Sequence, residues 1–218
     1  MGDVYPRFNI AEIRRTLTDV CRQFDRINDR IASRREKLTM VMVDQILLAY
    51  DYLNGLLEKD CDLFSPAGMY SMLELNHIVL CGTDVRKRLE YHQHLMETRN
   101  RFQKCAVDVR AWYKQRGAKL DPYRKATEFY TIALSMPQMF VEGNHRTENV
   151  IVNYLLVTEG CAPFVLDMEN AVAYLDLSAE VKYSDRHNLI NQISSFPKHR
   201  RDIAAVFGKY GDERYLSR

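Results

Sequence analysis

The chain has 218 residues, a formal net charge of +2, and 46% hydrophobic residues. This charge is too small to indicate nucleic-acid or membrane binding by itself, and no run of eighteen apolar residues indicates a membrane span. The five cysteines are odd in number and include no Cys-x-x-Cys pair, which argues against a disulfide framework or a zinc site and favours a reducing compartment. Because no signal peptide opens the sequence, we expect a cytoplasmic protein.

The first sixty residues carry apolar positions at helical spacing. One stripe recurs every three or four residues, at Ile10, Ile13, Leu17, Val20, Phe24, Ile27 and Ile31. It predicts a helix that either packs on its own domain or forms a coiled-coil-like seam with a second copy of the chain. Ser33 and Glu36 then form a capping-box pattern, which predicts a second helix from Ser33 unless one helix runs through it. We therefore expect residues 1–60 to form a helical arm and residues 61–218 to form the main domain.

Cap and stop signals predict two helices in the next sixty residues. Ser65-Pro66 is typical of an N-cap followed by the first helical position, and Gly82 of a helix stop. The stretch from Asp84 to Arg116 reads as helix, with a break expected near Asn100.

The same signals continue to the end of the chain. Asp121-Pro122 predicts another helix start, and Pro137 interrupts that helix. An apolar helix follows and ends at Gly160. An extended piece over 161–167 and helices over about 179–193 and 197–207 complete the chain. No alternating β pattern of any length is present, so the predicted fold class is all-α.

The stretch QMFVEGNHRTEN, Gln138–Asn149, has the composition of a phosphate-binding turn. Gly143 permits a backbone conformation that a side chain would resist. A helix beginning here would present its N–H groups and the positive end of its dipole to an anion. Taken alone, the residues fit either an anion-binding turn or a plain connection between helices.

This loop resembles the motif of Fic-family proteins, H-P-F-x-[D/E]-G-N-G-R-x-x-R. Flanking stretches are also similar to the family, namely Leu73–Leu80, Val109–Tyr113, Asn153–Leu156 and Gly160–Val165. The resemblance covers residues 65–176, with the motif core at 121–176. It implies a Fic-type helical domain.

The resemblance also implies roles for single residues. Asn144 would help to line the anion pocket, Arg146 would contact nucleotide phosphates, and Glu142 would help to hold a Mg²⁺ that bridges them. Gly143 would belong to the same nucleotide-binding loop, and Phe140 would anchor the loop in the core. The implied cofactor is ATP or another nucleotide with Mg²⁺. The implied reaction is transfer of AMP, another nucleotidyl group or phosphate to a protein hydroxyl.

Three residues depart from the motif. Gln138 stands where the family has its catalytic histidine, and a glutamine amide cannot replace a general base, which is typically worth about 10²–10⁴ in rate. His145 replaces the second glycine, at a position where the Doc branch of the superfamily has a phosphate-contacting lysine. It is also the alternative candidate for a base, since a helix N-terminus favours neutral imidazole. Asn149 stands in place of the second arginine.

Two features bear on partners. Thr83–Arg99 reads as helix, whereas the family has a target-docking β-hairpin in this region, so the family's usual mode of docking a target is not expected. The family's inhibitory motif, [S/T]-x-x-x-E-[G/N], is not found in the sequence. Basic pairs such as Arg34-Arg35 are interpreted as exposed helical charge balanced by acids, so nucleic-acid binding has no support.

The leading hypothesis is a degenerate Fic-fold protein of the pseudoenzyme kind, weak or inactive as an AMP transferase, that keeps a phosphate or nucleotide pocket. It would act through a protein target or partner, or through a homodimer formed by the N-terminal helix. The first alternative is an active protein-modifying transferase with an atypical site. The second is a structural helical module that binds no nucleotide.

Overall fold

A computed structural model describes residues 5–217, which form an all-α protein with one very short pair of strands. The helices are α1 Ile10–Arg22, α2 Phe24–Asn28, α3 Met40–Glu58, α4 Pro66–Cys81, α5 Val85–Glu90, α6 His92–Gln115, α7 Pro122–Leu134, α8 Asn144–Thr158, α9 Ala171–Lys182 and α10 Phe196–Tyr210. Single helical turns, of 3₁₀ or π type, lie at Gly117–Lys119, Asn191–Ser195 and Glu213–Tyr215. Strands β1 Arg7–Phe8 and β2 Leu216–Ser217 pair in antiparallel fashion.

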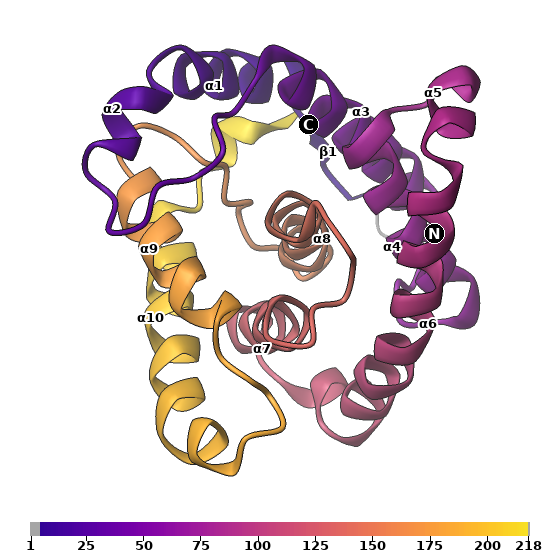
Figure 1. The fold of residues 1–218 in the computed structure, drawn as a ribbon, viewed down its shortest axis with the longest axis vertical. Coiled ribbons are helices and arrows are strands. Elements are labelled where there is room, and N and C mark those ends of the chain that lie inside the picture. The colour runs from indigo at the N-terminus through magenta and orange to yellow at the C-terminus, as the bar shows by residue number, and fades with distance from the viewer. Residues whose placement is uncertain (1–4, 218) are drawn as a thin grey trace.

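Helix α8 lies at the centre of the molecule. Figure 1 looks along this helix and shows the other helices arranged around it. Eleven of its fifteen residues are buried, including three consecutive ones, Val150, Ile151 and Val152. A helix that is apolar on all sides is typically enclosed in a core. Helices α3, α4 and α7 pack directly against it.

The N-terminal stripe packs on its own chain. It is divided between α1 and α2, which meet at Gln23, and Ile13, Val20 and Ile27 are each at most 1% exposed. Helix α1 lies against α3, and both contribute to the same continuous core as α8. Of the two roles that the sequence left open, the stripe therefore has the first, which is packing on its own domain. A dimer formed through the stripe would require these residues to leave the core.

The predicted helix start at Ser33 is wrong. Helix α3 begins at Met40, and its N-cap is Thr39, whose hydroxyl accepts a hydrogen bond from the backbone N–H of Met42 (3.2 Å). Residues 29–39, here called the connector, contain no helix. The Asn28 side chain explains why, because it bonds both the N–H and the carbonyl of Arg35 (2.9 and 3.1 Å) and so competes with helical bonding.

The cap signals of the next helices are confirmed. Ser65, Asp84 and Asp121 each accept backbone N–H groups as N-caps of α4, α5 and α7, and Gly82 ends α4 with φ of 70°. The break in the following helix lies at Tyr91 rather than near Asn100. No residue of α5 is buried, so α5 is not fixed in line with α6 by packing in the core.

The C-terminal helix boundaries differ from the prediction. Helix α9 begins at Ala171, eight residues before the expected start, and ends at Lys182. The expected continuation to residue 193 fails because Leu189 and Ile190 are exposed by 71% and 73% and have no core to pack on. Helix α10 passes through Gly208 and ends before Gly211.

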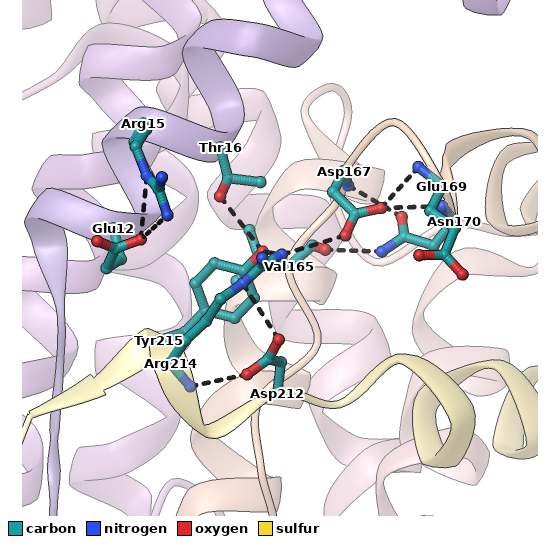
Figure 2. Close-up of polar contacts among 10 residues, drawn as sticks. All are labelled: Glu12, Arg15, Thr16, Val165, Asp167, Glu169, Asn170, Asp212, Arg214 and Tyr215. Atoms are coloured by element: carbon teal, nitrogen blue, oxygen red, sulfur yellow. Dashed lines mark hydrogen bonds and ion pairs between the residues drawn. The ribbon is translucent and has the colours of Figure 1, made fainter.

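A polar cluster ties the C-terminus to the extended piece after α8 (Figure 2). The Asp167 carboxylate accepts the N–H groups of Glu169 and Asn170 (both 2.9 Å), and Arg214 donates to Asp167 (3.3 Å). The hydroxyl of Tyr215 lies 3.3 Å from that of Thr16 on α1. These contacts fix residues 164–167, two of which line the cavity described below.

None of the helices within residues 5–217 is both long enough and apolar enough to span a lipid bilayer.

Candidate functional site

The loop between α7 and α8 is anchored at its centre. The side chain of Phe140 is fully buried and stacks on Phe102 of α6, with ring centroids 5.6 Å apart. The N–H of Met139 donates to the carbonyl of Ala133 at the end of α7 (2.9 Å). Phe140 therefore has the core position expected from the sequence.

Two asparagines fix the shape of the loop. Asn144 accepts the N–H of Phe140 (2.8 Å) and donates to the carbonyl of the same residue (3.1 Å). Asn76 on α4 donates to the carbonyl of Glu142 and to the hydroxyl of Thr147, both at 3.0 Å. Because the Asn144 amide is occupied by the loop backbone, its contribution to the site is mainly to hold the loop.

Gly143 lies at the junction of loop and helix. It is the N-cap of α8 with φ of 73°, a left-handed conformation that favours glycine. A Cβ here would lie 3.1 Å from Cδ2 of Leu80 and 3.3 Å from Nδ2 of Asn76. Among residues 5–217 no side chain caps α8, so its first-turn N–H groups remain available to an acceptor.

A cavity of about 390 Å³ lies against this helix start. The structure brings all the residues proposed from the motif into its wall, namely Gln138, Glu142, Gly143, Asn144, His145, Arg146 and Asn149. Much of the apolar lining comes from the N-terminal region, and it includes Leu17, Leu38 and Ile46. Sequence reasoning did not anticipate that α1, α3 and the connector help to enclose the site.

Gln138 and Asn149 occupy positions where the Fic motif has a histidine and an arginine. The carbonyl oxygen of the Gln138 side chain lies 3.5 Å from Nδ2 of Asn144, and its amide nitrogen is buried without a partner among the described residues. Asn149 accepts from Nδ2 of Asn153 at 3.5 Å. Neither side chain can take a proton near neutral pH.

His145 is a neutral histidine. Burial lowers its pKa to about 3, and the positive charges of Arg35, Lys182 and Arg146 act in the same direction. Its Nε2 lies 3.1 Å from a guanidinium nitrogen of Arg35. Arginine only donates hydrogen bonds, so Nε2 is the acceptor and the proton is on Nδ1. With its lone pair engaged, His145 has no free nitrogen with which to act as a base in this state.

Arg35 and Lys182 are cavity residues that the sequence reasoning missed. Arg35 was interpreted as exposed helical charge, but it is half-buried in the connector and donates to the carbonyl of Leu175 (2.8 Å) and the hydroxyl of Ser178 (3.2 Å) on α9. Lys182 lies in the last turn of α9. Thr39 directly before an apolar run was the signal that could have identified the connector, whereas nothing in the sequence marks Lys182.

Arg146 and Glu142 face the same cavity with opposite charge. Arg146 donates to the carbonyl of Val79 (3.4 Å), and burial lowers its pKa while the carboxylates of Glu36 and Glu142 oppose that effect. An arginine remains cationic in such surroundings. Its guanidinium is therefore a positive charge held beside the N-terminus of α8.

The fit of a Mg²⁺ ion can be judged from the carboxylates. Glu142 and Glu36 both line the cavity, and Glu142 is largely exposed, 3.7 Å from Nε2 of His94. Within residues 5–217 no cluster of three or more His, Cys, Asp or Glu residues could hold a metal ion by itself. Mg²⁺ bound with phosphates usually needs only one or two carboxylates. The residues present therefore fit a Mg²⁺ that arrives with a phosphate ligand.

Comparisons with known proteins add no relative. A scan against protein-family models, a search of curated proteins and a search of solved structures each found no match to this chain. The resemblance to Fic proteins accordingly rests on the residues quoted from the sequence.

Proposed function

We propose that this chain is a phosphate- or nucleotide-binding protein of degenerate Fic type that lacks AMP-transferase activity and acts through a protein partner. The observation that carries the proposal is the cavity at the uncapped start of α8, with Arg146 in its wall. Free N–H groups, the helix dipole and a fixed guanidinium together favour an anion.

The state of the two residues considered as the general base, Gln138 and His145, argues against transfer to a hydroxyl. Gln138 cannot serve as a base, and the lone pair of His145 is engaged by Arg35. The loop nevertheless keeps the parts needed for binding, since Gly143 and Asn144 maintain its shape. A site with its phosphate contacts but without its base is expected to bind and not to turn over.

Thermal unfolding with added nucleotide tests the binding. At a ligand concentration about 100 times the dissociation constant, binding adds about 2.7 kcal/mol, which for a chain of this size raises the Tm by roughly 5–10 °C. We expect such a rise with at least one of ATP, GTP, UTP and CTP in the presence of Mg²⁺, and its loss in Arg146→Ala. Arg124→Ala, which removes an exposed arginine of α7, serves as the control. Equal Tm values with and without every nucleotide would contradict the proposal.

A second experiment tests the lack of activity. Incubation of the protein with labelled ATP should give no self-modification in the wild type. Gln138→His restores the residue type that the motif has at this position. If label appears in the wild-type protein itself, the chain is an active transferase and the pseudoenzyme proposal is wrong.

A further inference from the structure

The wall of the cavity has an excess of positive charge. It contains four cationic and two acidic side chains, namely Arg34, Arg35, Arg146, Lys182, Glu36 and Glu142. Arg34 pairs with Asp29 on the surface at 3.4 Å. By contrast, no carboxylate of residues 5–217 lies within 4.0 Å of the charged nitrogens of Arg35, Arg146 or Lys182. Cations that are partly removed from water without a counterion are costly, unless a ligand supplies the opposite charge.

Arg35 is held in place before any ligand arrives. The Asn28 side chain fixes its backbone, and its guanidinium bonds Leu175 and Ser178 of α9 and the ring of His145. The connector is tied down a second time, by the N–H of Ala32 donating to Asp176 (2.9 Å). Figure 1 shows the connector passing beside α9. An arginine fixed in this way loses little conformational entropy when it binds a ligand.

Unused donors remain at this point of the cavity. A guanidinium has five N–H groups, and the three contacts of Arg35 to Leu175, Ser178 and His145 leave some of them without a protein partner. The Nδ1 of His145 is buried and has no partner among residues 5–217. This nitrogen carries the ring proton, so it is a donor. The cavity thus combines an unbalanced charge with unsatisfied donors.

We infer that Arg35 and Lys182, which lie outside the loop, bind the same phosphate group as Arg146, and that the ligand carries a phosphate with at least two negative charges. The inference rests on the proposed function and adds two residues that bind the anion, Arg35 of the connector and Lys182 of α9. A phosphate with two negative charges would face the three cations of the wall that have no paired carboxylate, namely Arg35, Arg146 and Lys182. The N–H groups of Arg35 that have no protein partner supply hydrogen bonds that a phosphate requires.

The test is a calorimetric titration of the full-length protein with inorganic pyrophosphate, first in EDTA and then with Mg²⁺. The variants are Arg35→Gln and Lys182→Gln, and the matched control is Lys37→Gln. Lys37 carries the same charge, lies in the same connector and pairs with Asp25 on the surface, outside the cavity wall. The side chain of Lys182 makes no hydrogen bond within residues 5–217, so its variant is expected to fold normally even if Arg35→Gln is destabilised.

We expect both cavity variants to raise the dissociation constant at least about tenfold, since a charge-assisted hydrogen bond is lost. Lys37→Gln should stay within about twofold of the wild type, because salt screens an exposed charge. If the wild type binds and the cavity variants match Lys37→Gln, the inference is wrong while the proposed function stands. If the wild type binds neither pyrophosphate nor any of the four nucleotides, the proposed function itself is wrong.

Discussion

Gly143 is the residue on which the shape of the candidate site depends most. Its left-handed backbone turns the chain from the loop into α8, and its hydrogen side chain leaves room for Leu80 and Asn76. The sequence was sufficient to mark this glycine as a turn. It was not sufficient to show that α4 supplies the atoms that surround it, because that contact joins segments more than sixty residues apart.

Replacing Gly143 by alanine should destabilise the fold and weaken nucleotide binding. Gly160 is the matched control, since its φ is 75° and, in the part of the chain that the structure describes, no atom beyond its chain neighbours lies within 4 Å of the Cβ that an alanine would add. A left-handed alanine costs about 1–2 kcal/mol at either site, and the crowded Cβ at Gly143 should add about 1 kcal/mol or more. Urea unfolding of both variants measures this difference. Equal losses would mean that the loop relaxes around the new methyl group.

The protonation of His145 should make stability depend on pH. Its pKa is about 3 in the folded protein, against an ordinary value of 6.5. Between these values the unfolded chain binds a proton that the folded protein does not, so stability falls as the pH is lowered from about 6.5 towards 3, by at most about 1.4 kcal/mol per pH unit. His145→Gln keeps an acceptor for Arg35 and should flatten this part of the profile. Unchanged profiles in urea unfolding at pH 5 and 7 would show that His145 is not buried as a neutral ring.

At the scale of elements, the cap residues were the reliable part of the sequence. Ser65, Asp84 and Asp121 act locally, through a side-chain bond to a backbone N–H a few residues ahead, so their pattern is readable without knowledge of the fold. The connector was misread because the bonds between Asn28 and Arg35 outweigh the capping box at Ser33. The limits of α9 were misread because apolar residues near 190 are exposed rather than buried.

The connector is expected to act on the site through Asn28. Asn28→Ala removes the two bonds that hold the backbone of Arg35, so it should weaken binding of pyrophosphate as well as lower stability by about 1–2 kcal/mol. Asn188→Ala is the control, because the Asn188 side chain also accepts a backbone N–H, that of Ile190 (2.9 Å), in an exposed turn that does not line the cavity. Calorimetry and urea unfolding should separate the two variants. If both leave the affinity for pyrophosphate unchanged, the ordering of the connector plays no part in binding.

At the scale of the whole molecule, the N-terminal helices are part of the core. Asn153 at the centre of α8 donates to the hydroxyl of Tyr50 on α3 (2.6 Å), and Tyr154 donates to the carbonyl of Cys61 (2.8 Å). The buried side chains of α1, α3, α7 and α8 form one continuous cluster. The amphipathic stripes could be predicted from sequence, but the surface on which they pack could not, because periodicity gives the buried face of a helix and not its partner.

A fragment of residues 61–218 should therefore fail to fold by itself. Without α1 and α3 it would expose the faces of α4 and α8 that α3 covers and leave the Asn153 amide without the Tyr50 hydroxyl. We expect its near-ultraviolet circular dichroism to be lost and its thermal unfolding to be broad, with the full-length chain as control. A sharp cooperative transition in the fragment would support the division at residue 60 that the sequence predicts.

The start of α8, the connector and α9 all line the cavity in which we expect the phosphate to bind. The most direct test is a crystal structure of the full-length protein grown with saturating pyrophosphate. We expect a phosphate group in the cavity, at about 3 Å from the first-turn N–H groups of α8 and from the guanidinium of Arg146. A cavity that stays empty at saturation, or a phosphate bound elsewhere on the surface, would contradict this expectation.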